Sequence, residues 1–507
     1  MSSSTIDTKT TPPSLRKSVA LNSLWNFAGQ VSPLLLAVFA IPILVHKLGV
    51  DRYGVLTLAW ILVGYFSLFD FGLGRAITKL LAEKIALNDS ENSASLIGTA
   101  LLSMLLLGLF FCALLFVLGP WITRSLLKVP SGLQHETLRC IPWLAASIPF
   151  VIVTSGLRGI LEAQQNFAIV NGLRAALGFF SYLGPLAVVL FSRNLFPVIL
   201  TLAIIRIASC ALHFWACGRY VPVFSRRLAW SRQAFRGLIG FGSWMTISNI
   251  ITPLLVYLDR FVVGALISIS AVAYYAVPFD AVTKLWMIPT ALAGVLFPAF
   301  SESLAINDQV RVTGLYERSL VTTFSILFPL VLACVLFAHE GLRIWLGNDF
   351  AARSSTVLQI FAIGVFTNSL ANMPYALLQA SGRPDLTAKI HLVEAPCYIA
   401  LLLWAIRAHG IEGAALAWTI SLSVEAAVLF FLLRNVLAPR LWITMTAGTA
   451  VLVIACGITE TVLKLLFFLA SVGIFAGVVW RWTLDDPLRL RLRSWLRTMP
   501  VLHRVGA

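Results

Sequence analysis

Long apolar segments recur along the whole chain, separated by short polar stretches that carry most of the charge. A helix needs about 20 apolar residues to cross the hydrocarbon core of a bilayer. The pattern therefore predicts an all-α integral membrane protein with about fourteen spans. The last two segments are joined by only a few residues, so they form either two spans or one re-entrant unit. The predicted spans are 20–45, 55–77, 94–119, 140–160, 175–192, 195–217, 240–264, 271–296, 319–338, 355–379, 389–407, 412–433, 442–459 and 464–482.

The distribution of basic residues between these segments predicts the orientation of the chain. With the N-terminus placed in the cytoplasm, the cytoplasmic loops and tails hold 25 Lys and Arg residues and the opposite side holds 10. Cytoplasmic loops of membrane proteins carry such an excess. An even number of spans also places the Arg-rich segment after 482 in the cytoplasm. The N-terminal tail has no pattern of a cleaved signal peptide, so we expect a multi-pass protein of the bacterial inner membrane with both termini cytoplasmic.

Composition changes this picture little and excludes several classes of protein. Hydrophobic residues make up 59% of the 507 positions and charged residues only 12%, whereas soluble domains carry about 25% charged residues. The net charge of +16 comes from short basic clusters between apolar runs, which suit anionic lipid headgroups rather than nucleic acid. The seven cysteines form no CxxC pair and no zinc spacing, and no phosphate-binding loop is present. We therefore expect no metal site, no cofactor and no nucleic-acid partner.

A faint internal repeat predicts how the spans are grouped. Trp25, Pro33 and Tyr53 around the first span match Trp244, Pro253 and Tyr274 around the seventh, with a slip of one residue. The offset equals six spans, as in transporters built from parallel repeats, although chance similarity between apolar sequences explains three matches too. The predicted organisation is a cytoplasmic tail (1–19), an N-lobe (20–217), a cytoplasmic linker (218–239), a C-lobe (240–437), two further spans (438–482) and a basic cytoplasmic tail (483–507).

Five short motifs resemble the polysaccharide (Wzx-like) flippases of the multidrug/oligosaccharidyl-lipid/polysaccharide exporter superfamily. Their order and spacing from about residue 15 to 440 are more specific than any one of them. The motifs are KLGVDRYG (47–54), FDFGLGRAITK (69–79), YLDRFVVG (257–264), WLGNDFAARS (345–354) and LLQASGRPDLTAK (377–389).

The resemblance implies a MATE-like fold of two six-helix lobes plus a C-terminal helix pair, with a cavity that opens to alternate sides. It also implies export of undecaprenyl-pyrophosphate-linked oligosaccharide, with membrane lipids, a polysaccharide polymerase and chain-length proteins as further partners. The related peptidoglycan-precursor flippases are known for basic residues lining the cavity. Here the first span has no Lys or Arg between Val19 and Val45, which argues for a different glycan.

Charged residues within the predicted spans are the candidate functional residues, because a charge in mid-bilayer costs at least about 2.5–3.5 kcal/mol and usually faces a cavity or a partner. Arg206 lies mid-span with no acidic residue three or four positions away. Asp259 and Arg260 point about 100° apart on a helix, so we do not expect a simple pair. Asp280 and Lys284 lie on one face and can form an internal salt bridge or hold a substrate group. The predicted substrate-binding residues are Arg206, Arg260 and Lys284.

Acidic residues and one further arginine are predicted to serve in gating or in coupling to a cation. Each has a structural alternative, such as an inter-helix hydrogen bond or an ion pair that lowers the cost of insertion. The predicted gating or coupling residues are Asp70, Arg75, Asp259, Asp280, Glu394 and Glu425.

The function predicted from these features is transport rather than catalysis. A drug/cation antiporter of the same superfamily is the main alternative, and it favours acidic over basic cavity residues. A membrane glycan polymerase or ligase is a second alternative, but it needs a large external loop, and the longest hydrophilic segments here are 218–239, 299–318 and 339–355.

Overall fold

The computed structural model describes residues 35–66, 70–87, 89–225, 229–238, 257–434, 436 and 438–482. These residues form helices joined by short turns and contain no strand, so the prediction of an all-α membrane protein is confirmed. Among them, nine helical runs are long and apolar enough to cross a bilayer. The predicted first span and seventh span fall partly outside the described residues, and the count of fourteen stays a prediction.

The chain divides into two compact units, 1–273 and 274–507. The division falls inside helix α9, between Ala273 and Tyr274. The predicted lobe boundary at 218–239 stays a prediction, because much of 226–256 lies outside the described residues.

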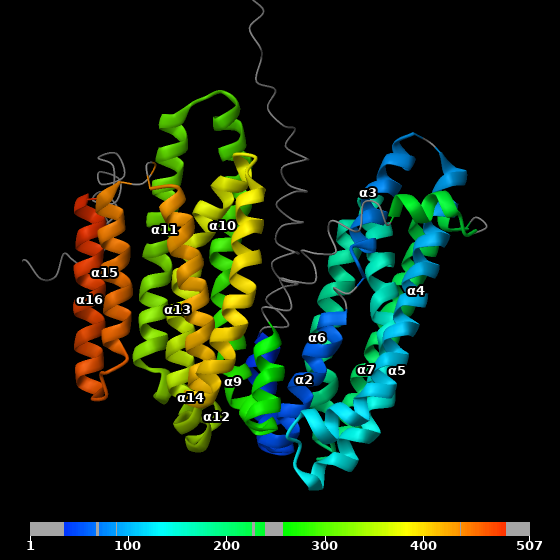
Figure 1. Cartoon of the computed structure of the whole chain (residues 1–507), viewed down its shortest axis with the longest axis horizontal. Helices are drawn as coiled ribbons and strands as arrows, with labels where there is room; N and C mark the ends of the chain where they lie inside the picture. The colour runs from blue at the N-terminus through cyan, green and yellow to red at the C-terminus, as the bar shows by residue number, and fades with distance from the viewer. Residues whose placement is uncertain are drawn as a thin grey trace, which may run out of the picture. The chain divides into compact units, whose positions relative to one another are not determined.

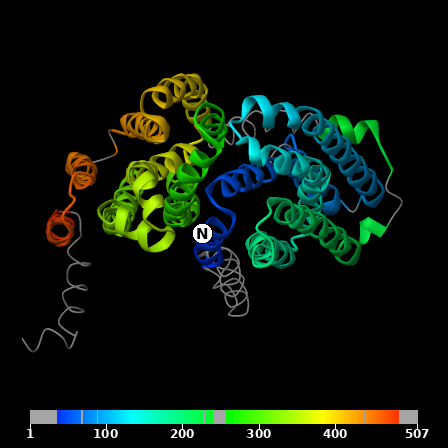
Figure 2. The same cartoon turned by 90° about the horizontal axis from the view of Figure 1, so that it is seen from below.

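Unit 1 is a bundle in which α5 contacts α2, α3, α4, α6 and α7, and Figure 2 looks nearly along its helices. Close approach depends on small residues: a side chain at Gly159 would meet the backbone oxygen of Gly74 at 2.5 Å, as expected where helices pack without water. The helices of unit 1 are 35–48, α2 (Val50–Phe66), α3 (Leu73–Ala86), α4 (Ser90–Trp121), η1 (Ile122–Leu126), α5 (Ser131–Ala163), α6 (Phe167–Val189), α7 (Leu195–Tyr220), η2 (Pro222–Ser225), 232–238 and 257–266.

Unit 2 is arranged around α13, which packs against α10, α11, α12 and α14 (Figure 1). A cluster of buried rings holds α11, α13 and α16 together, with Phe328 4.5 Å from Phe475 and 6.2 Å from Phe366 between ring centroids. The helices of this part of the chain are α9 (Ile269–Val282), η3 (Thr283–Trp286), α10 (Met287–Ala305), α11 (Gln309–Leu336), α12 (Ala338–Leu346), α13 (Asn348–Ala380), α14 (Pro384–Leu432), α15 (Pro439–Ala455) and α16 (Thr461–Trp482).

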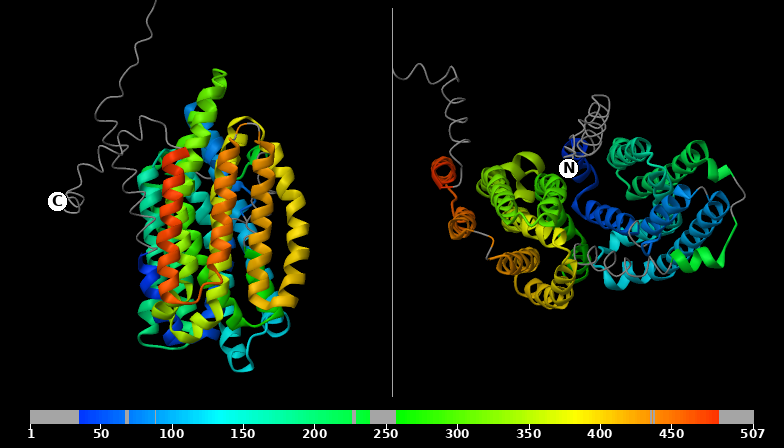
Figure 3. Two further views of the ribbon diagram at one scale, coloured as in Figure 1. Left: turned by 90° about the vertical axis from the view of Figure 1, so that its left-hand side faces the viewer. Right: turned by 90° about the horizontal axis from the view of Figure 1, so that it is seen from above.

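Helix α14 is a hairpin of two antiparallel arms (Figure 3, left). His409 and Gly410 leave helical geometry, and Gly410 has φ 60°, a backbone conformation that glycine adopts at little cost. The two arms correspond to the predicted spans 389–407 and 412–433. Helices α15 and α16 form a second hairpin that packs on α11.

One predicted span is wrong as a continuous helix. The segment 55–77 is divided between α2 and α3, and the described part of the break contains Phe71 and Gly72 with φ of 50° and 71°. Positive φ at two successive positions is incompatible with a right-handed helix. Hydrophobicity continues across the break, which is why the apolar pattern gave no sign of it.

Candidate functional site

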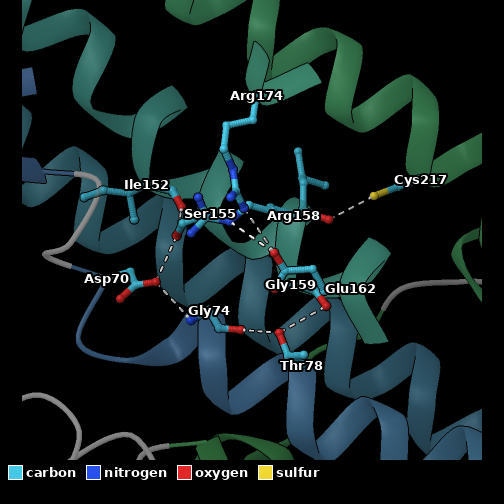
Figure 4. A network of polar contacts seen from close by, with 11 residues as sticks. Asp70, Gly74, Thr78, Ile152, Ser155, Arg158, Gly159, Glu162, Arg174 and Cys217 are labelled. Carbon is cyan, nitrogen blue, oxygen red and sulfur yellow. Dashed lines mark hydrogen bonds and ion pairs between the residues drawn. The ribbon is translucent and has the colours of Figure 1, made fainter. Parts of the chain in front are cut away.

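Asp70 lies at the break between α2 and α3, and it holds the first turn of α3 (Figure 4). Its Oδ1 accepts a hydrogen bond from the backbone N–H of Gly72 at 2.9 Å. Its Oδ2 accepts from the N–H of Gly74 and from the Ser155 hydroxyl, both at 3.0 Å. The side chain is almost wholly buried. These bonds satisfy N–H groups that the start of a helix leaves without a partner and tie α3 to α5.

An ion network continues from Ser155 along α5 toward α6 (Figure 4). The Arg158 Nε and the Arg174 Nη2 lie 3.7 Å and 3.6 Å from the same carboxylate oxygen of Glu162. All three side chains are partly exposed, so the network lies at an exposed edge of the bundle rather than in a buried site. Arg75, a predicted gating residue in the first turn of α3, is exposed and has no ion pair with a described residue.

Arg206 lies in the middle of α7 and is half-buried. Within the described part of the chain, no hydrogen bond or ion pair reaches its guanidinium. A cationic group in mid-span without a local acidic partner is costly unless it faces water, a cavity or an anion. The structure thus preserves the feature that made Arg206 a candidate.

Arg260 differs, because the expectation that Asp259 and Arg260 form no pair is wrong. The Arg260 Nη1 lies 3.2 Å from the Asp259 Oδ1, which also accepts the backbone N–H of Arg260 at 2.8 Å. Both side chains are buried, and the Arg260 guanidinium lies 5.2 Å from the ring centroid of Tyr257. The long arginine side chain bends back across the 100° that separates neighbouring positions on a helix. Its role toward a phosphate stays a prediction, with part of its charge balanced by Asp259.

The internal salt bridge between Asp280 and Lys284, one of the two alternatives for this pair, is not formed. The α-helix ends at Val282, and Thr283–Trp286 form a 3-10 turn. A 3-10 helix has three residues per turn, so positions four apart no longer share a face. Both side chains are exposed, and Lys284 pairs with no described residue. Lys284 belongs to unit 2, whereas Arg206 and Arg260 belong to unit 1.

The two predicted coupling carboxylates in α14 lie close together, one on each arm. His391 lies between them: its Nδ1 is 3.2 Å from the Glu394 Oε2 and its Nε2 is 3.9 Å from the Glu425 Oε1. The Ser421 hydroxyl donates to the other oxygen of Glu394 at 2.6 Å. We refer to His391, Glu394, Ser421 and Glu425 as the α14 cluster.

Glu394, Ser421 and Glu425 of the α14 cluster border a groove of about 500 Å³ between the two arms of the hairpin. Most of the lining is aliphatic, including Ile390, Val393 and Val424. The Glu394 and Glu425 side chains are only 16% and 9% exposed. Lys389 also borders the groove, but its ammonium is 3.2 Å from Asp385. Two largely buried carboxylates therefore face an apolar space, and the imidazole of His391, which is not part of the lining, contacts one of them.

His391 was missed in the sequence, although a signal was present. His391 and Glu394 are three positions apart and therefore share a helix face. The sequence did not show that the two arms of α14 pack against each other. This packing places Glu425 next to His391, although the two residues are 34 positions apart.

Comparisons with known proteins agree with this architecture. The family described as "Polysaccharide biosynthesis protein" matches residues 43–355. The Shigella flexneri protein named "Putative O-antigen transporter" is 31% identical over 417 residues, which are 82% of this chain and 97% of that protein.

Two solved structures show the same fold at low sequence identity. The lipid II flippase MurJ in an inward closed conformation has a TM-score of 0.70 at 12% identity, covering 91% of this chain and 99% of its own. An inward-facing multidrug resistance MATE family transporter of the MOP superfamily has a TM-score of 0.67 at 14% identity, covering 84% and 99%. The chain therefore belongs to the polysaccharide biosynthesis protein family.

Proposed function

We propose that the protein flips an undecaprenyl-pyrophosphate-linked oligosaccharide from the cytoplasmic to the periplasmic leaflet of the inner membrane by alternating access. The product would feed the synthesis of a surface polysaccharide such as O-antigen, capsule or exopolysaccharide. Membership of the family supports the glycan class, and the O-antigen transporter named above is the relative that suggests it. The residue that carries the proposal is Arg206, a mid-span cation without an acidic partner among the described residues.

The chemistry of such a substrate explains why a mid-span arginine is useful. Sugar hydroxyls and phosphate charges lose their water in hydrocarbon, so they need a polar path through the bilayer. A guanidinium offers a planar set of donors that matches phosphate oxygens. Arg260 and Lys284 are the other proposed phosphate partners, and the prenyl tail would remain in lipid.

The membrane potential favours the proposed direction. An inside-negative potential drives anions outward by about 2.3 kcal/mol per charge per 100 mV. Two phosphate charges would therefore gain about 5 kcal/mol at that potential. Coupling to a cation through Glu394 or Glu425 is compatible with this direction but is not required by it.

The test replaces Arg206 in a strain whose surface glycan depends on this gene. We expect Arg206→Ala to abolish most surface glycan and to cause the lipid-linked precursor to accumulate in the cytoplasmic leaflet, whereas Arg206→Lys retains part of the activity. Arg219→Ala, at the exposed end of the same helix, is the matched control and should leave the glycan unchanged. Unchanged surface glycan in Arg206→Ala, with normal protein levels, would show that the phosphate assignment is wrong.

The multidrug/cation antiporter remains the alternative function, and the acidic, largely apolar groove of α14 is the observation that favours it. Deletion would then leave the lipid-linked precursor unchanged and lower resistance to lipophilic cations. Measuring the precursor and drug resistance in the same deletion strain separates the two functions. If the protein were a polymerase, its deletion would instead cause single lipid-linked repeat units to accumulate in the periplasmic leaflet.

A further inference from the structure

We propose that the α14 cluster binds a divalent transition-metal ion of the zinc class, with His391 and Glu425 as ligands and Glu394 as the residue that positions the imidazole. The inference concerns a site in unit 2 and does not depend on the proposed substrate.

Glu425 is the residue whose surroundings favour a bound cation. Its side chain is more than nine-tenths buried and borders the groove. No described residue donates a hydrogen bond to its carboxylate, and the His391 Nε2 lies 3.9 Å from its Oε1, beyond hydrogen-bond distance. A buried carboxylate without a hydrogen bond is costly, and a bound cation would remove that cost.

The charges around the cluster leave this cost uncompensated. One imidazole can balance one carboxylate at most, whereas the cluster contains two. Lys389 borders the same groove but is held by Asp385 at 3.2 Å. The aliphatic lining lowers the local dielectric constant and strengthens the repulsion between the two carboxylates. A divalent ion would balance both.

The hydrogen bonds of Glu394 prepare His391 for a metal. Glu394 Oε2 faces the Nδ1 of His391, and Glu394 Oε1 accepts from Ser421. Both carboxylate oxygens are thus engaged, and with the proton on Nδ1 the lone pair of Nε2 points toward Glu425. Metal-binding histidines in proteins usually have this arrangement, in which a carboxylate accepts from the ring nitrogen that does not bind the metal.

The distance between His391 Nε2 and Glu425 Oε1 fits this interpretation. A tetrahedral zinc ion with bonds of about 2.0–2.2 Å holds two ligand atoms about 3.4 Å apart. The observed 3.9 Å is too long for a hydrogen bond but needs only a side-chain adjustment of about half an ångström to accept the ion. The His391, Glu394 and Glu425 ligand atoms all lie within 4.8 Å of one another. Glu425 borders the groove, from which water would complete the coordination.

The test measures Zn²⁺ binding by isothermal titration calorimetry, with the full-length protein in detergent and without a histidine tag. We expect wild type to bind one equivalent of Zn²⁺ at this site. His391→Gln and Glu425→Gln should lose that step, and Glu394→Gln should bind about 10- to 100-fold more weakly because it removes the positioning residue. His409→Gln, an exposed histidine at the turn of the same helix, is the matched control and should bind as wild type does.

A second measurement guards against variants that fail to fold. Because the ion would join the two arms of α14, Zn²⁺ should raise the unfolding temperature of wild type and of His409→Gln, and EDTA should reverse the rise. Folded His391→Gln should show no rise. Cys397 also borders the groove and is the alternative ligand. The proposal is wrong if wild type binds no Zn²⁺, if His391→Gln and Glu425→Gln still bind it, or if Cys397→Ser loses the binding instead. Each of these results would mean that the α14 cluster binds no metal ion.

Discussion

Two buried acidic sites, Asp70 in unit 1 and Glu425 in unit 2, differ in how their charge is satisfied. Asp70 accepts three hydrogen bonds, from Gly72, Gly74 and Ser155. Glu425 is equally buried but accepts no hydrogen bond from a described residue, and the His391 Nε2 lies 3.9 Å from its carboxylate. Both residues interrupt apolar sequence, so hydrophobicity alone does not distinguish them.

The difference separates a structural role from a binding role. A carboxylate that accepts three hydrogen bonds at the start of a helix stabilises the fold. It has little capacity left to bind a substrate or an ion. A carboxylate that is buried without such bonds raises the free energy of the folded state and has that capacity. Gating by Asp70 stays a prediction, but the local geometry explains its presence without gating.

The largest expected effect on the unfolding free energy comes from replacing Asp70. Asp70→Asn replaces one acceptor oxygen by an NH₂ group, which would face either the N–H of Gly72 or, in the flipped orientation, both the N–H of Gly74 and the hydroxyl of Ser155. We expect a loss of about 2–4 kcal/mol in unfolding free energy, since donors are left without acceptors in a buried place. Reversible unfolding in mixed detergent measures it. Ser155→Ala, which removes one of the three bonds, should cost about 1 kcal/mol. Equal and small losses in both variants would contradict a structural role for Asp70.

The sequence predicted the helices much better than it predicted these sites. Apolar length determines where a helix can cross the bilayer, so α4 to α7 and the two arms of α14 agree with the predicted spans. The break at Phe71 and Gly72 depends on backbone dihedral angles, which hydrophobicity does not encode.

Regular helix geometry did not suffice to predict the contacts between side chains. The Asp259–Arg260 pair depends on the reach of a long side chain, and the unformed Asp280–Lys284 contact depends on a local 3-10 turn. The α14 cluster requires the pairing of two arms, which no local spacing reveals. Glu394 and Glu425 could therefore be selected as candidates, but not recognised as neighbours.

A third acidic residue tests whether the difference between Asp70 and Glu425 arises from the unit in which each lies or from its hydrogen bonds. Glu340 of α12 lies in unit 2, yet the Lys464 Nζ of α16 donates to both of its oxygens at 2.8 Å and 3.1 Å. Burial acts to raise the pKa of Glu340, but the hydrogen bonds from Lys464 and from its own backbone outweigh burial. The pKa is therefore held below the ordinary value of 4.5.

We expect Glu340→Gln to cost about 1–2 kcal/mol near pH 7, less than the 3–5 kcal/mol typical of a fully buried pair, because Glu340 is 27% exposed. A carboxylate with a lowered pKa contributes stability that is complete above its unfolded value and is lost as pH falls through the folded value. The difference in unfolding temperature between wild type and Glu340→Gln should therefore be constant from pH 6 to 8 and shrink below about pH 4.5. In a Lys464→Met background, Glu340→Gln should add no further loss.

The smallest expected effect sharpens the comparison most. In EDTA, Glu425→Gln should leave the unfolding free energy unchanged or raise it by up to about 1 kcal/mol, because a neutral amide costs less to bury than a carboxylate that accepts no hydrogen bond. Glu394→Gln on the facing arm is the matched control. It disturbs the bonds to His391 and Ser421 and should cost about 1 kcal/mol. If Glu425→Gln instead destabilises the protein as much as Asp70→Asn does, then Glu425 is held by bonds of the same kind. The two sites would then share a structural role, and the argument for an ion in the α14 cluster would lose its basis.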